Sequence, residues 1–261
     1  MTSRRVQLIS QTALLFTLLA GLATALGALP IYFKKDFSKK SLDVGLGFSA
    51  GVMLVAAFMS LIIPGIEEAR KVYTENLALP LVVLGIVLGY LFIIFIHEYL
   101  PHEHFYKNQD MSHKKTMSRV TLIVLAISLH NIPEGLAVGV GFGSGDEAAG
   151  ISLAVAIALQ NMPEGLVVAI GLISEGSTKH RAFLMALLSG LVEPIAAIFG
   201  FWATGLTHYS LPMTLGFAGG TMLFVICQEI FPELFRQGHE KFATMGVVTG
   251  IITMLAIDFY L

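Results

Sequence analysis

Two short polar motifs interrupt long apolar stretches of this chain, and their side chains are of the types that bind metal ions. The first motif, residues 130–135, reads His-Asn-Ile-Pro-Glu-Gly, and the second, residues 160–165, reads Gln-Asn-Met-Pro-Glu-Gly. Carboxylates and amides are expensive to bury in hydrocarbon, so polar residues in such a setting mark a functional site by default. Because the two motifs are so alike, we expect one polar site assembled from two helices in the middle of a membrane.

The two motifs belong to a longer internal repeat. Residues 126–141 and 156–171 share ten identical residues in sixteen aligned positions. Consecutive membrane helices run antiparallel, so we expect a two-fold axis in the membrane plane to relate the two copies. Transporters with such inverted repeats hold their substrate near the midplane, at broken helices.

The spacing within each motif places three polar side chains close together. On a helix that turns about 100° per residue, the glutamate lies between the residues three and four positions before it. The six side chains are His130, Asn131 and Glu134 on the first helix and Gln160, Asn161 and Glu164 on the second. Imidazole favours zinc and its transition-metal neighbours, whereas carboxylates and amides accept several divalent ions, so we expect a metal site that can bridge two cations. The alternative for a single membrane histidine is a hydrogen bond between helices.

Each motif also contains a proline that interrupts the backbone hydrogen bonds of its helix. Pro133 and Pro163 have no N–H to donate to the carbonyl four residues earlier, and a carbonyl freed in lipid needs another partner. A simple kink would explain the prolines but not the adjoining asparagines and glutamates. Glu193, directly before Pro194, repeats the pattern on the sixth apolar stretch. It is a further candidate ligand, with an interhelical hydrogen bond as the alternative.

Other residues suggest an entrance and an exit for the ion. Met53, Ser60 and Glu67 recur every seven residues, so they drift only about 40° around the second helix, although packing explains Met53 and Ser60 equally well. The loop after the third apolar stretch is rich in histidine and suits loose metal capture or release, with a solvated polar loop as the alternative. The exit candidates there and near the inner end of the seventh stretch are His97, His102, His104 and Glu229.

The composition is that of a membrane protein throughout. The chain is 55% hydrophobic and 13% charged, far from the values of a soluble domain of 261 residues. We expect an all-α polytopic protein, a single transmembrane domain over residues 1–261, with an uncleaved first helix. Eight apolar stretches are long enough to cross a bilayer: 7–31, 43–66, 79–100, 119–142, 148–173, 182–206, 212–235 and 242–260. No basic stripe points to nucleic acid, and the single cysteine, Cys227, excludes a thiolate cluster or a disulfide within one chain.

Positive charge orients the helices. Lys and Arg prefer the cytoplasmic side of short loops. Twelve of the sixteen lie after the first, third, fifth and seventh stretches, against four on the other side. The count predicts that both termini lie outside the cell.

With His-Asn-x-Pro-Glu-Gly on the fourth stretch and a second Pro-Glu-Gly on the fifth, the chain closely resembles the ZIP family of divalent-metal transporters over essentially its whole length, and most of all the bacterial GufA/ZupT branch. The resemblance implies eight helices, outside termini, a homodimer and a bacterial inner (plasma) membrane. It also implies a binuclear site on a helix bundle that slides against a scaffold. By resemblance, one ion would be held by His130, Glu134, Gln160 and Glu164, with Met53 nearby. The second ion would be held by Asn131, Glu134, Asn161, Glu164 and Glu193. The resemblance also implies an entrance at Ser60 and Glu67 and an exit site at His97, His102, His104 and Glu229.

The residues and the resemblance together predict an uptake carrier for Zn²⁺ and related divalent ions (Fe²⁺, Mn²⁺, Co²⁺, Cd²⁺), moved into the cytoplasm as substrate with no catalytic cofactor. One alternative is an intramembrane metalloenzyme. The chain lacks the His-Glu-x-x-His motif of zinc proteases and the Glu-x-x-His pairs of di-iron bundles. A channel, or a transporter of another solute, is the second alternative, and saturation and competition between metals would separate a carrier from a pore.

Overall fold

The computed structural model describes residues 11–34, 37–99, 119–204, 209–235 and 238–260, and every regular element in these ranges is a helix. The elements are α1 (Gln11–Ala28), α2 (Pro30–Phe33), α3 (Lys39–Val55), η1 (Ala56–Ile62), α4 (Ile63–Val72), α5 (Glu75–Tyr99), α6 (Arg119–Gly143), α7 (Glu147–Ser174), α8 (Lys179–Gly190), α9 (Val192–Thr204), α10 (Leu211–Val225), η2 (Ile226–Ile230), α11 (Phe231–Leu234) and α12 (Glu240–Tyr260). The elements η1 and η2 are π-helical turns inside otherwise α-helical rods.

Seven helical stretches within the described residues are long and apolar enough to cross a membrane, which confirms an all-α polytopic membrane protein. They are Gln11–Phe33, Lys39–Val72, Glu75–Ile96, Glu147–Ser174, Lys179–Thr204, Leu211–Leu234 and Glu240–Tyr260. The remaining predicted stretch, 119–142, coincides with α6, which carries the first motif. The sixth stretch, predicted as one run over 182–206, is divided between α8 and α9, because the helix is interrupted at Leu191 shortly before Pro194.

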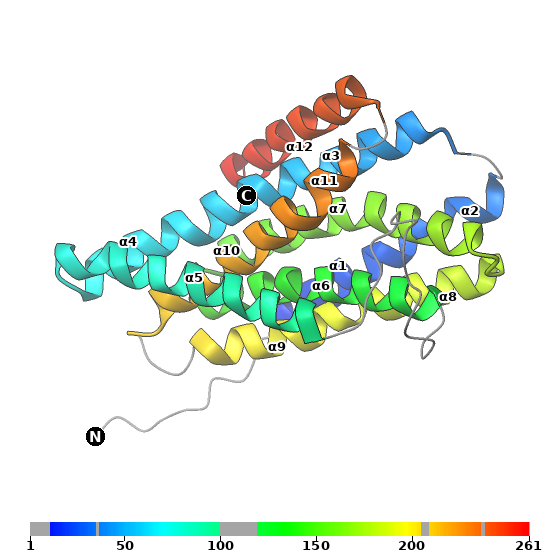
Figure 1. Ribbon diagram of the computed structural model, residues 1–261. Helices are drawn as coiled ribbons and strands as arrows, with labels where there is room; N and C mark the ends of the chain where they lie inside the picture. Colours follow the sequence, from blue (N-terminus) through cyan, green and yellow to red (C-terminus); the bar gives the residue numbers. More distant parts are fainter. Residues whose placement is uncertain (1–10, 35–36, 100–118, 205–208, 236–237, 261) are drawn as a thin grey trace.

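The long helices lie nearly along one direction (Figure 1), and the contacts between them divide them into two bundles. In the first, which we call the site bundle, α1 packs against α7 and α6 packs against α9, with α8 beside α1. In the second, which we call the wall bundle, α3 packs against α12 and α10 packs against α5. The bundles meet chiefly where α3 lies against α7 and where α10 lies against α6. Both motifs are therefore on the site bundle, and α3 and α10 of the wall bundle face it.

The wall bundle is held together at eight glycines, two on each of the helices α3, α12, α10 and α5, where helix backbones touch. A Cβ atom placed on any of these glycines would lie within 3.0 Å of a backbone oxygen on the partner helix, which real side chains essentially never do. The two contacts are reciprocal, with a pair of glycines four residues apart on each helix, as in the small-residue packing of membrane helices. The pairs are Gly47 and Gly51 on α3 against Gly246 and Gly250 on α12, and Gly216 and Gly220 on α10 against Gly85 and Gly89 on α5.

The two helices of the wall bundle that face the site bundle also share a sequence pattern. Residues 47–54 and 216–223 both read Gly-Phe-x-x-Gly-x-Met-Leu. Each run is followed by a π-helical turn, η1 or η2, and then by Pro64 or Pro232 in the next turn. Helices α3 and α10 are thus built on one plan, and each contains one of the π-helical turns, a feature often found at functional sites.

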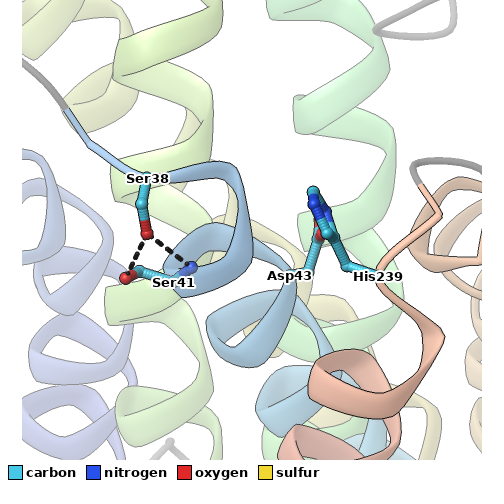
Figure 2. A network of polar contacts seen from close by, with 4 residues as sticks. All are labelled: Ser38, Ser41, Asp43 and His239. Atoms are coloured by element: carbon cyan, nitrogen blue, oxygen red, sulfur yellow. Dashed lines mark hydrogen bonds and ion pairs between the residues drawn. The ribbon is translucent and has the colours of Figure 1, made fainter.

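Polar side chains fix the first turn of α3 and tie it to α12 (Figure 2). The Ser38 hydroxyl accepts a hydrogen bond from the backbone N–H of Ser41 at 3.1 Å, which is an N-cap. One turn further on, the buried carboxylate of Asp43 lies 2.8 Å from Nδ1 of His239, directly before α12. This contact fastens the start of α12 to α3 at the end of the bundle where both helices begin.

Candidate metal centre

The two motifs face each other because α6 and α7 are joined by a tight turn. Gly145 adopts a φ of 90°, a left-handed conformation that suits glycine, and the Asp146 side chain caps α7 by accepting from the N–H of Ala149 at 3.1 Å. The two helices therefore run antiparallel and pack side by side. Their prolines, Pro133 and Pro163, lie inside the helices, as predicted.

The glycine that ends each motif brings in a third and a fourth helix. A Cβ atom on Gly135 would lie within 3.0 Å of the backbone of Glu193 on α9, and one on Gly165 would collide with the carbonyl of Thr24 on α1. The final glycine of Pro-Glu-Gly is thus required by close backbone approach in both copies. Helices α1 and α9 reach the level of the motifs for this reason.

One carboxylate and one amide are paired across α6 and α7. The Gln160 side chain donates from Nε2 to Oε1 of Glu134. Both side chains are completely buried, at 0% exposure. A buried carboxylate is costly unless it is paired and hydrogen-bonded, and the amide of Gln160 supplies one such bond.

A second carboxylate and amide are paired across α7 and α9. Nδ2 of Asn161 donates both to Oε1 of Glu193, at 2.7 Å, and to the carbonyl oxygen of Ala20 on α1, at 2.9 Å. Glu193 lies in the first turn of α9, where unpaired backbone N–H groups favour negative charge. Asn161 is therefore held in one orientation, with its amide nitrogen turned toward α1 and α9.

After these bonds are made, the buried side chains still have polar atoms without a hydrogen-bond partner in the described part of the chain. Each of the residues concerned is at most 2% exposed. The atoms are Nδ2 of Asn131, Oε2 of Glu134, Oε1 of Gln160, Oδ1 of Asn161 and Oε2 of Glu193. Almost all are oxygens, the ligand type of hard and borderline divalent ions, and an unpaired buried polar atom requires an explanation.

The carboxyl groups of the three helices lie near one another. Glu134 interacts electrostatically with both Glu164 and Glu193, and Glu193 interacts with Glu164. No three His, Cys, Asp or Glu side chains of the described residues are gathered closely enough by themselves to hold a metal ion. Two of these carboxyl groups are hydrogen-bonded to amides, Glu134 to Gln160 and Glu193 to Asn161.

The other predicted residues lie on several helices and differ in how far they are buried. Met53 is completely buried on α3, Ser60 is half-buried on η1 with its hydroxyl oxygen enclosed, and Glu67 is exposed on α4. Burial therefore decreases from Met53 through Ser60 to Glu67. Glu229 is half-buried on η2. His130 lies on α6 and His97 on α5, although their side chains, and all of His102 and His104, fall outside the described residues.

Two groups at the site were not found from the sequence. One is the carbonyl of Ala20, which accepts from Asn161. The other is the hydroxyl of Ser49 on α3, which donates to the backbone carbonyl of Gln160 at 2.8 Å. A backbone carbonyl carries no signal in its side chain, and Ser49 lies in a run of small residues that reads as helix packing.

The structure thus defines a polytopic membrane protein with a buried cluster of carboxylates and amides on antiparallel helices. The chain belongs to the ZIP family: the model of the family described as "ZIP Zinc transporter" matches residues 5–121 and 100–258. This match confirms the resemblance seen in the two motifs. The members of the family are transporters rather than enzymes.

Individual relatives support this membership along nearly the full chain. Zinc transporter GufA of Myxococcus xanthus is 42% identical over 246 residues, covering 94% of this chain and 97% of the relative. Zinc transporter ZIPB of Bordetella bronchiseptica is 41% identical over 237 residues, covering 90% of this chain and 77% of the relative. Zinc transporter ZupT of Stenotrophomonas maltophilia is 34% identical over 254 residues, with 93% of each chain covered.

Proposed function

We propose that this protein carries zinc and related divalent metal ions across a membrane into the cytoplasm, with Glu134, Gln160, Asn161 and Glu193 among the groups that hold the ion. The observation that carries the proposal is the buried cluster whose unpaired atoms are nearly all oxygens, at the meeting point of α6, α7 and α9. A divalent cation would satisfy those oxygens together, which no single further hydrogen bond can do. The names of the relatives, all zinc transporters, support zinc as the substrate.

The two hydrogen-bonded pairs suggest how the cluster is held together. Gln160 donates to Glu134 and Asn161 donates to Glu193, so each amide satisfies one oxygen of one carboxyl group. When an ion enters, Glu134 and Glu164 would lie between two positions. One position would add His130, Gln160 and Met53, and the other would add Asn131, Asn161 and Glu193. A carboxyl group that carries a proton must lose it to coordinate the ion, so zinc binding should depend on pH.

The arrangement of helices supports eight crossings with both termini outside. Helix α1 begins and α12 ends at the same end of the molecule (Figure 1), as an even number of crossings requires. The excess of Lys and Arg in the sequence after the first, third, fifth and seventh apolar stretches supports a cytoplasmic location for the loops there. Glu67 and Ser60 would lie on the entry side, and Glu229 with the histidines of the loop after α5 on the exit side.

The division into two bundles supports a cycle in which the site bundle moves past the wall bundle. The wall bundle is locked by backbone contact at its glycines. The site bundle contains both motifs and Glu193, so its movement would carry the whole cluster from one side to the other. We place the protein in the bacterial inner membrane as a homodimer, in keeping with the family resemblance.

Zinc uptake into proteoliposomes tests the proposal directly. We expect saturable uptake by the wild-type protein and a loss of at least about 100-fold in Glu134→Ala, because the change removes a shared ligand, and even outer-sphere groups cost 10–100-fold in metal affinity. Iron, manganese, cobalt and cadmium added as competitors rank the other substrates.

The matched control is Glu147→Ala, which removes an exposed glutamate from the first turn of the same helix pair, far from the motifs. This variant should transport zinc at the wild-type rate. Normal zinc uptake by correctly inserted Glu134→Ala protein would refute the site assignment. A folded wild-type protein that binds zinc but never transports it would favour a metalloenzyme or a sensor.

A further inference from the structure

One hydrogen bond joins the two bundles at the level of the motifs. The hydroxyl of Ser49, on α3 of the wall bundle, donates to the backbone carbonyl of Gln160, on α7 of the site bundle, at 2.8 Å. Both residues are completely buried, at 0% exposure. The bond therefore connects the helix that is locked to α12 with the turn that carries the second motif.

The accepting carbonyl lies in the turn that Pro163 disturbs. A proline in a helix removes one backbone donor and pushes the preceding turn away from regular geometry. Carbonyls in such a turn need partners from neighbouring helices or serine and threonine side chains. The carbonyl that Pro163 itself leaves without a backbone donor is that of Leu159; the carbonyl of Gln160, the next residue in the same turn, accepts from Ser49.

The residues one turn before and one turn after Ser49 on α3 have no side-chain hydroxyl or amide. One turn earlier on the same face, Gly45 lies so close to Pro163 that an added Cβ would be 3.2 Å from the proline side chain. One turn later, on the same face, is the buried Met53. Between a glycine and a flexible thioether, Ser49 is the group whose interaction with α7 depends on direction and distance.

A hydrogen bond of this kind exists in only one register of the two helices. A helix rises about 1.5 Å per residue, and a hydrogen bond is lost when donor and acceptor separate by more than a few tenths of an ångström beyond 3.2 Å. Any sliding of α7 along α3 by one residue or more breaks the bond between Ser49 and Gln160. Apolar contacts on the same face change far less with such a shift, because they are not directional.

We propose that Ser49 is a positioning residue of the transport cycle, whose hydroxyl holds the site-bearing helix α7 in this one register against α3. The proposal rests on the proposed function in that the two bundles must move relative to each other. Removing the hydroxyl stabilises no new state. It lowers the population of the register seen here relative to shifted registers, roughly threefold to tenfold, the worth of one buried hydrogen bond.

The population is measured by the distance between spin labels on the two bundles. Cysteines at Lys39 and Ser174, both exposed and at the same end of the molecule, report on α3 and α7, in a Cys227→Ser parent that has no other cysteine. Electron–electron double resonance on the full-length protein in nanodiscs gives the distance distribution. Ser49→Ala should shift the ratio of its populations threefold to tenfold away from the parent's main distance.

The control is Ser189→Ala. Ser189 is a buried serine that donates to the carbonyl of Ala186 within its own helix, so its loss leaves the contact between the bundles intact. It should leave the distances unchanged. Ser49→Gly, which also removes the hydroxyl and adds no cysteine, replaces Ser49→Ala if that variant folds poorly, and should shift the populations in the same direction.

If the distance distribution of Ser49→Ala matches that of the Ser189→Ala control, the proposed role of Ser49 is wrong. This conclusion does not depend on the result of the zinc uptake assay. Zinc uptake by the unlabelled parent is measured separately. A parent that takes up no zinc overturns the proposed function, whereas the distance distributions still decide whether Ser49 sets the register of the two helices.

Discussion

Changing Asn161 to aspartate should make the stability of the protein depend on metal. The amide nitrogen of Asn161 makes two hydrogen bonds, to the carboxylate of Glu193 and to the carbonyl of Ala20. Asn161→Asp has nearly the same shape but replaces this donor with an acceptor, so both bonds are lost and a carboxylate oxygen faces Glu193. A bond to a charged group is worth about 1.5–3 kcal/mol and a neutral one about 0.5–1.5 kcal/mol.

The metal-free variant should therefore be less stable than the wild type by about 2–4.5 kcal/mol, the sum of those two ranges. At roughly 2–4 °C per kcal/mol, its Tm should fall by about 4–18 °C. Zinc should reverse most of this loss. A ligand at 100 times its Kd stabilises the folded state by about 2.7 kcal/mol, and the added carboxylate supplies a charged ligand where an amide stood.

The assay is thermal unfolding in detergent at pH 8, with chelator or with zinc. The alkaline pH is chosen because a proton shared between two carboxyl groups would replace the lost donor in more acidic solution. Asn161→Leu is the control, since it loses the same bonds and gains no ligand. A metal-free Asn161→Asp protein that melts with the wild type, or a zinc-induced rise no larger than that of Asn161→Leu, would refute the reasoning.

Two further predictions concern the wall bundle. Gly51→Ala should lower the free energy of unfolding by about 1–3 kcal/mol, because the new Cβ would collide with the carbonyl of Val247. The control is Gly141→Ala, whose Cβ would make ordinary contacts at 3.4 Å. Equal melting temperatures of the two variants would contradict the backbone contact at Gly51. His239→Ala should cost about 1–3 kcal/mol by leaving the buried Asp43 carboxylate without its partner. A double-mutant cycle with Asp43→Ala measures the coupling, and strictly additive effects would show that the pair does not stabilise α12.

The sequence was most informative where a polar residue or a proline stands within an apolar stretch, because such a residue is costly there unless it has a function. Glutamate, asparagine and proline within apolar stretches located the site, and the angular position of Glu134 and Gln160 on their helices agrees with the hydrogen bond between them. The positions of the seven candidate membrane spans within the described residues followed from apolar length alone. These features are local, so they can be read from one chain.

The contacts between bundles could not be predicted in the same way. Which glycines meet which carbonyls, and that Ser49 reaches Gln160, depends on the register of helices far apart in the chain. The acceptor on Ala20 is a backbone carbonyl, which every residue has, so the residue type does not indicate its role. The break at Leu191, inside an apolar stretch, was hidden because hydropathy does not distinguish one long helix from two short ones.

The π-helical turns η1 and η2 have a consequence for comparing this chain with its relatives. A π-helical turn is equivalent to one residue inserted into an α-helix, so everything after it is rotated by about 100°. Beyond Ala56 and Ile226, a side chain's face cannot be counted from the residues before the turn. A relative with one residue fewer in either helix would present a different set of side chains to the ion without any substitution, so a single-residue gap in an alignment there changes which residues line the path.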